Sequence, residues 1–202
     1  MATLAGRITI YNMALGFIGT RTLASPNENT PEAIQCGLYW DVARRAALRD
    51  YPYRFALQRI QLGLLAKMPE VYDNQWKFAY SLPDSCLKVH SVYAERETDF
   101  KQKFQIESYE KGQLILTDLE NAIALCTLDI DEISLWDDMF VTVMARKLAC
   151  MIAIPLLKNN SQKLQELEQL YQAAVPRAQG HDASEQRQFQ PLDSWLLARG
   201  EW

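Results

Sequence analysis

The side chains best suited to chemistry are acidic ones that gather at two places in the chain, Asp129-Ile130-Asp131-Glu132 and Asp137-Asp138. Two carboxylates that face each other roughly 5–9.5 Å apart across a cleft can hydrolyse a glycosidic bond. Asp137 and Asp138 are adjacent in a predicted helix, so their side chains diverge. Asp131 and Glu132 suit a helix N-terminus, where negative charge meets the positive end of the helix dipole. Because the first cluster also lacks the glycine and spacing of a calcium loop, a structural role is favoured.

The histidines and cysteines show no pattern of nucleophilic catalysis or metal binding. The two histidines, His90 and His181, fall in different predicted elements, whereas a nucleophile–histidine pair needs a third group that orients the imidazole. The four cysteines have no CxxC spacing, and isolated cysteines of this kind are typically buried thiols: Cys36, Cys86, Cys126 and Cys150. No HExxH, GxSxG, Walker or GxGxxG motif occurs. We therefore predict a protein that is not an enzyme and uses no cofactor or metal.

Basic side chains concentrate in one stretch, which comprises Arg44, Arg45 and Arg49, with Arg54 and Arg59 beyond. One interpretation is an interface or a DNA-facing patch, because arginine is frequent among the residues that dominate binding energy. The other is a solvated helix face that pairs with Asp41 and Asp50. The sequence leaves both interpretations open.

Overall charge and hydropathy narrow the class of protein. The net charge of -4 argues against a protein that holds DNA through many phosphate contacts, although DNA can still slide past its surface. The most apolar stretch runs from Met139 to Leu157 and carries Arg146 and Lys147 at its middle. Each of these charges costs about 2.5–3.5 kcal/mol at a bilayer centre. With no signal-peptide pattern in Met1–Arg7, we predict a core helix of a soluble, cytosolic protein.

Five helical segments follow from hydrophobic spacing and end signals. The first covers 8–18 and ends at Gly19. The second begins after Thr30, which can cap it, and runs to about Asp50, with Ile34, Leu38 and Val42 spaced along one face. A third covers 54–65. A long helix over 134–154 follows further along, ended or kinked by Pro155, and another begins after position 160 or 161.

Between these helices the pattern changes to short alternating runs typical of strands. Strands are expected over 87–93, 104–106, 114–117 and 123–129, with a hairpin turn at 110–112. The predicted fold class is α+β, mainly α: an antiparallel helical bundle with a small inserted antiparallel β-sheet and an extended C-terminal arm. The bundle domain comprises 1–68 and 132–180, the β-rich insertion 69–131 and the arm 181–202.

The arm carries bulky apolar side chains after a polar spacer, and a free segment of that composition must be buried on its own core or on a partner. Together with the basic stretch it supplies the candidate residues for binding a partner or a neighbouring subunit: Arg44, Arg45, Arg49, Trp195, Leu196, Leu197, Arg199 and Trp202.

Several ordered segments together resemble the head-to-tail adaptors of short-tailed bacteriophages, also called tail tubular protein A. They are Ile10–Leu15 with Ile18-Gly19, Cys36–Leu48, Tyr51–Ala56, Trp76–Tyr80, Leu82–Leu87, Trp136–Phe140, Ala145–Ala149, Asp182–Glu185 and Ser194–Arg199. No single motif is catalytic; the resemblance rests on the ordered set, which spans nearly the whole chain. The sheet region is compact, whereas some members of that family carry larger insertions there.

The resemblance implies a structural virion protein of the tail, assembled in the host cytoplasm. It implies a homo-oligomeric ring, usually of twelve copies, between the portal protein and the tail nozzle protein. The ring encloses a channel through which double-stranded DNA passes without sequence recognition, and no membrane is involved. Two alternatives remain from the residues alone: a carboxylate-dependent polysaccharide hydrolase that uses Asp131 and Glu132, and a helical cytosolic binding module.

Overall fold

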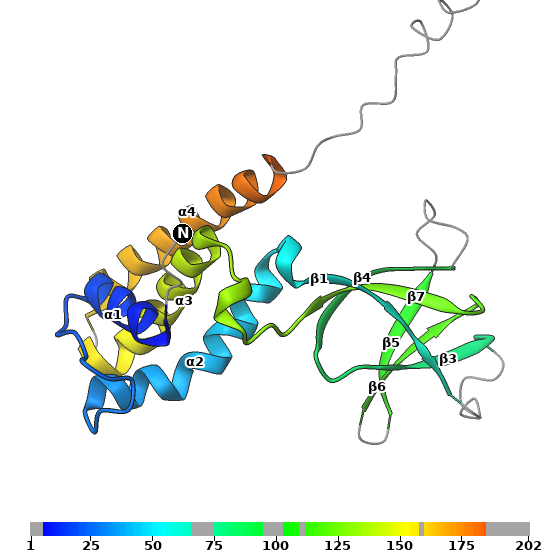
Figure 1. The fold of residues 1–202 in the computed structure, drawn as a ribbon, viewed down its shortest axis with the longest axis horizontal. Helices are drawn as coiled ribbons and strands as arrows, with labels where there is room; N and C mark the ends of the chain where they lie inside the picture. Colours follow the sequence, from blue (N-terminus) through cyan, green and yellow to red (C-terminus); the bar gives the residue numbers. More distant parts are fainter. Residues whose placement is uncertain (1–5, 66–74, 95–102, 110–111, 158–159, 185–202) are drawn as a thin grey trace, which may run out of the picture.

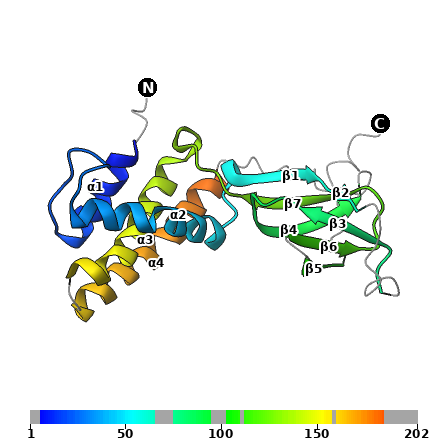
Figure 2. The same cartoon turned by 90° about the horizontal axis from the view of Figure 1, so that it is seen from below.

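The structure, a computed structural model, describes residues 6–65, 75–94, 103–109, 112–157 and 160–184. Helices gather at one end of an elongated molecule and strands at the other (Figures 1 and 2). The helical part consists of α1 (Arg7–Ile18), α2 (Pro31–Asp50), α3 (Asp138–Leu157) and α4 (Ser161–Ser184). The strands lie between α2 and α3 in the sequence, so the chain leaves the helical part after α2 and returns before α3.

The first two helices begin and end where the sequence signals lie. Gly19 follows α1 with a left-handed φ of 85°, which a residue without a Cβ adopts at little cost, and its N–H binds the carbonyls of Leu15 and Gly16. Thr30 caps α2 by accepting a hydrogen bond from the Ala33 N–H, and a proline occupies the first helical position. Both predicted helices are confirmed.

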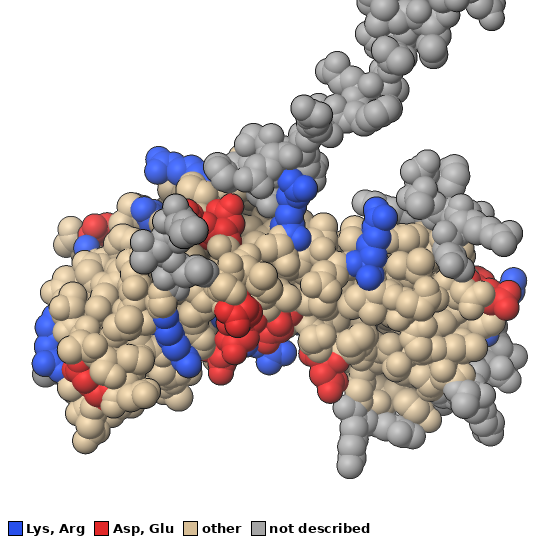
Figure 3. Space-filling model, viewed as in Figure 1, with Lys and Arg blue, Asp and Glu red and all other residues tan. Residues whose placement is uncertain are grey.

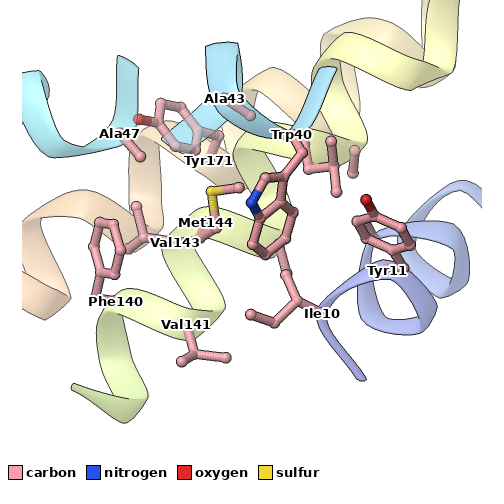
Figure 4. Packing of buried hydrophobic residues seen from close by; sticks show 14 of the residues in the cluster. Ile10, Tyr11, Trp40, Ala43, Ala47, Phe140, Val141, Val143, Met144 and Tyr171 are labelled. Carbon is pink, nitrogen blue, oxygen red and sulfur yellow. The ribbon is translucent and has the colours of Figure 1, made fainter. Parts of the chain in front are cut away.

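The apolar α3 is the centre of the helical part and packs against the other three helices. Its buried residues face Ile10 and Tyr11 of α1, Trp40 of α2 and Tyr171 of α4 (Figure 4). The Trp40 ring packs edge-on against Tyr11, with 5.4 Å between centroids, and stacks on Trp136 at 5.8 Å. By length and composition α3 is apolar enough to cross a membrane, and half of its most apolar stretch is buried among these neighbours.

Two prolines lie inside helices rather than at their ends. The sequence predicts that Pro155 ends or kinks the long helix, yet α3 continues to Leu157. Its missing N–H removes only one hydrogen bond close to the C-terminal end of the helix. Pro176 lies within α4, which extends to Ser184, beyond the predicted start of the arm at 181.

The strands form two antiparallel sheets. The first has the order β1 (Leu57–Gln61), β7 (Ala122–Leu128) and β4 (Cys86–Ala94). The second has the order β2 (Gly63–Leu64), β3 (Phe78–Leu82), β6 (Gly112–Thr117) and β5 (Phe104–Tyr109). An apolar core drawn from both sheets, with Tyr80, Val92, Ile115 and Cys126 among its members, is separate from the core of the helices. The strands β5 and β6 pair up to Tyr109 and Gly112, on either side of the hairpin turn predicted at 110–112, of which residues 110 and 111 lie outside the described residues.

The predicted fold class, a mainly helical bundle with a small inserted sheet, is wrong. The described residues contain four α-helices and seven strands in two antiparallel sheets, and the β-part has its own core. The main cause is the segment predicted as a helix over 54–65. Only Arg54–Ala56 is helical there, as the 3-10 turn η1, and the chain then forms β1 and β2. The β1 strand gains a full antiparallel ladder with β7, and this tertiary pairing overrides local helical spacing.

The larger aliphatic side chains of α2 lie on its outer face, whereas a simple hydrophobic count would place them on the inner face. Its inner face is built from small side chains around one large aromatic, comprising Ala33, Cys36, Trp40, Ala43, Ala47 and Leu48. The three branched residues spaced by four, Ile34, Leu38 and Val42, face outward and are 54%, 64% and 56% exposed. Small residues let α2 approach α3 closely, so the larger aliphatic side chains remain on the solvent side.

Candidate interaction surface at the junction of helices and sheets

Arg44 forms the centre of an ion-pair network where α2 meets the end of β7. Its side chain is only 7% exposed. The Nε and Nη2 atoms donate to the two carboxylate oxygens of Asp129 at 2.8 and 3.0 Å. Nη1 donates to Asp41 at 2.7 Å and to Asp131 at 2.5 Å. Asp41 is on the same helix, whereas Asp129 and Asp131 follow β7, so one guanidinium ties the helical part to the sheets.

The charges explain why an arginine is stable at a buried position. Burial alone lowers the pKa of the Arg44 guanidinium, but the hydrogen bond and charge of Asp129 and the charges of Asp131 and Asp41 outweigh it. The net result is a raised pKa, so Arg44 stays fully charged. The planar fork of arginine suits the bidentate contact with Asp129, which a lysine cannot make.

The next two arginines of the basic stretch lie at the surface. Arg45 has a side chain that is 54% exposed, with its Nε 3.6 Å from Asp129. Arg49 is exposed and its Nε donates to the Leu87 carbonyl of β4 at 2.9 Å. Both line a groove of about 440 Å³, completed by the turn between β3 and β4 and by the β5–β6 hairpin: Leu82, Pro83, Asp84, Ser108, Gly112 and Gln113.

Charged side chains of both signs therefore gather where the molecule narrows between its two parts. Figure 3 shows an acidic group at this junction with basic side chains beside it. Because Arg44 is satisfied inside the chain, the basic side chains that this stretch presents at the surface are Arg45 and Arg49, beside the exposed carboxylates of Asp41 and Asp131.

An apolar ridge adjoins this basic groove. We use the term ridge for Ile34, Leu38 and Val42, which follow one another along the outer face of α2. At about 100° per residue, these three residues and Arg45 and Arg49 fall within roughly 80° of one another around the helix. One helix face is thus apolar over its first half and basic over its second half, which is the composition of an interaction surface.

The acidic clusters take structural positions. Asp129 and Asp131 bind Arg44, and Glu132 accepts a hydrogen bond from the Ser134 N–H at the start of the 3-10 turn η2 (Ile133–Leu135). Asp137 accepts a hydrogen bond from the Met139 N–H at the start of α3. Helix-start positions were predicted for such residues, but the pairing of Asp129 and Asp131 with Arg44 was missed. The signal in the sequence is only that a basic stretch contains Arg44 while an acidic run far along the chain contains Asp129 and Asp131.

The remaining predicted groups divide between the described and undescribed parts of the chain. Asp50, expected to pair with the basic stretch, contacts Lys147 at 3.3 Å and accepts a hydrogen bond from the Tyr171 hydroxyl instead. His90 lies on β4 within 2.8 Å of the Thr127 hydroxyl. Within the described ranges, no three His, Cys, Asp or Glu side chains are placed to hold a metal ion. Five partner-binding candidates lie outside the described residues: Trp195, Leu196, Leu197, Arg199 and Trp202.

The cysteines behave as packing residues with suppressed ionisation at three of four positions. Burial raises the pKa of the Cys36 thiol to about 12 and also raises that of Cys150. Cys126 on β7 and Cys86 on β4 share a hydrogen bond. This bond raises the pKa of Cys126 and lowers that of Cys86. All four thiols are free.

Comparison with models of known protein families and with curated proteins finds no match to this chain.

Proposed function

We propose that the chain is a structural subunit that joins other proteins, and specifically a head-to-tail adaptor of a phage tail that assembles into a ring between portal and nozzle. The observation that carries the proposal is the exposed ridge of Ile34, Leu38 and Val42 on an otherwise closely packed helix. An apolar surface that continues into a basic groove is favourable only when another protein covers it. The kind of assembly is proposed from the resemblance of the chain's ordered segments to tail tubular protein A.

The two-part architecture suits a subunit that holds two neighbours at once. The helical part and the sheets have separate cores, so each offers its own surface. The Arg44 network fixes one part to the other through hydrogen bonds of 2.5–3.0 Å. A closed ring requires that neighbouring subunits contact each other side to side in a fixed orientation, because small changes in angle prevent closure. A net charge of -4 suits passage of DNA without tight binding.

The two carboxylates that the hydrolase alternative requires are engaged by other groups of the chain. Asp131 binds the same guanidinium as Asp129, and Glu132 binds Ser134. A binding module with another partner is supported by the same ridge and groove, so the identity of the partner distinguishes it from an adaptor.

The proposal is tested by measuring the mass of the full chain with and without the portal ring of its own phage. We expect a ring to form on the portal, and a chain shortened at Glu185 to lose this assembly. A full chain that does not bind the portal at any concentration would refute the adaptor. Normal assembly of the shortened chain would refute the role of the arm alone.

A further inference from the structure

We propose that the groove between α3 and α4 holds a phosphate ion, which Arg146 and Arg177 bind from opposite ends of a small pocket. This pocket shares no residue with the groove at the junction of helices and sheets. The inference concerns a ligand of the single chain, so it does not rest on the adaptor proposal.

The pocket lies where α3 and α4 pack side by side (Figure 1). One face of each helix lines it: Met139, Thr142 and Arg146 of α3, and Ala174 and Arg177 of α4. Its volume is about 80 Å³. A single water needs about 10–15 Å³ of such space, so the pocket has room for an ion of about five heavy atoms but not for a nucleotide or a peptide.

The pocket concentrates positive charge that no neighbouring side chain compensates. Its lining contains two arginines and no acidic side chain, on a chain whose net charge is -4. Among the described residues, neither Arg146 nor Arg177 forms an ion pair with a carboxylate. Arg44, by contrast, is paired with three carboxylates. Two like charges that line one pocket repel each other, and an anion between them replaces this repulsion with two attractive contacts.

Arg146 is held in place by two other helices but lacks an acceptor for part of its guanidinium. Nη1 donates to the Leu170 carbonyl of α4 at 2.6 Å, and the guanidinium carbon lies 5.3 Å from the centre of the Phe17 ring of α1. The Nε atom is buried and has no hydrogen-bond partner. In Arg44 the corresponding atom donates to Asp129 at 2.8 Å. Because a buried donor without an acceptor is costly, Arg146 favours the approach of a negatively charged group.

Arg177 supplies the second guanidinium from the other end of the pocket. Arg146 contacts Leu170, and Arg177 lies about two turns further along α4. Because α4 follows α3 after a short connection, the two helices run antiparallel. Arg177 is therefore beside Met139, about two turns before Arg146 on α3. The two long side chains thus approach the space between them from opposite directions.

This arrangement favours a phosphate over a carboxylate or DNA. A carboxylate has two oxygens, which a bidentate contact with one arginine already occupies. A phosphate ion has its oxygens in a tetrahedral arrangement and carries roughly 1.5–2 negative charges near pH 7, so it can accept hydrogen bonds from both guanidiniums at once. DNA is held through many phosphate contacts, which a pocket with two arginines on an acidic chain does not provide.

Equilibrium dialysis of the full chain against radiolabelled inorganic phosphate, in chloride at constant ionic strength, tests the site. We expect one phosphate for each chain with a dissociation constant of roughly 0.1–1 mM, because the pocket is open to solvent and salt screens its charges. Arg177→Gln removes one guanidinium from an exposed helix position and should raise the dissociation constant by at least about tenfold. Arg45→Gln changes an exposed arginine of the junction groove, and this matched control should leave binding unchanged.

Thermal unfolding gives the second reading. Phosphate strengthens the burial of apolar surface in proteins generally, whereas a bound ion stabilises only the chain that binds it. The thermal midpoints of the parent chain and of Arg45→Gln should therefore rise more with added phosphate than the midpoint of Arg177→Gln.

The absence of saturable binding up to about 10 mM phosphate would overturn the inference. Equal binding by the parent chain and Arg177→Gln, or loss of binding in Arg45→Gln, would also overturn it, because the ion would then lie elsewhere. Acetate that competes as strongly as unlabelled phosphate would overturn the choice of a phosphate. None of these measurements involves a portal, so the adaptor proposal is tested separately.

Discussion

Replacement of Arg44 by methionine tests the junction of helices and sheets most sharply. The substitution keeps most of the aliphatic length but removes the charge that Asp129, Asp131 and Asp41 share. The Asp129 side chain is only 19% exposed, so it loses two hydrogen bonds without full access to water. The Asp131 and Asp41 side chains are 75% and 70% exposed and regain water freely.

The expected magnitude follows from these exposures. Hydrogen bonds that involve charged groups contribute about 1.5–3 kcal/mol, whereas exposed ion pairs contribute about 0–1 kcal/mol. We therefore expect Arg44→Met to lower the free energy of unfolding by about 3 kcal/mol and Asp129→Asn by about 2 kcal/mol. The matched control, Asp131→Asn, should cost less than about 1 kcal/mol because its side chain is mostly solvated.

Urea unfolding followed by tryptophan fluorescence measures all three variants, since Trp40 and Trp136 lie in the core close to the junction. The double variant Arg44→Met/Asp129→Asn should cost less than the sum of the single changes, because both remove the same contact. A cost below about 1 kcal/mol for Arg44→Met, or equal costs for Asp129→Asn and Asp131→Asn, would refute the proposed buried pair.

Three further outcomes follow from single features of the fold. Leu38→Gln should change the free energy of unfolding of the single chain by less than about 0.5 kcal/mol, whereas Leu48→Ala in the core should cost about 2–5 kcal/mol; equal costs in urea unfolding would contradict the outward ridge. Burial raises the pKa of Cys36 to about 12 and that of Tyr171 above its usual 10.0, so both must unfold before they ionise easily. Their contribution to the free energy of unfolding is complete below about pH 9 and is lost as the pH rises toward 12. Cys36→Ala should therefore reduce the loss of stability between pH 9 and 12, as followed by circular dichroism. An equal loss in the variant and the parent chain would count against a role of the thiol. Gly19→Ala should cost about 1 kcal/mol because of the left-handed φ of 85°, and a thermal midpoint equal to that of the parent chain would show that the C-cap tolerates a Cβ.

Local signals predicted the helix ends well because the interactions that fix them are local. Thr30 and Gly19 act within one turn of their own positions, so their roles can be read without knowledge of the fold. The strands β4, β5, β6 and β7 were also found, because their alternating or apolar runs are bounded by turn residues.

The features that the sequence did not reveal depend on partners far away in the chain. The 57–61 segment has helical spacing, and only its ladder with β7 makes it a strand. Arg44 has charged neighbours within its own helix, but its bidentate partner is Asp129, 85 residues away. The outward direction of Leu38 follows from close packing of alanines on α3, which hydrophobic spacing alone does not distinguish from a buried stripe.

The adaptor proposal is tested most directly by measuring the mass of the full chain in the presence of a phage portal ring. We expect a discrete complex in which many copies close into one ring on the portal, and in which a Leu38→Cys thiol on the ridge of α2 no longer reacts with a thiol reagent. A portal ring that gains no mass at any concentration of the chain would contradict it.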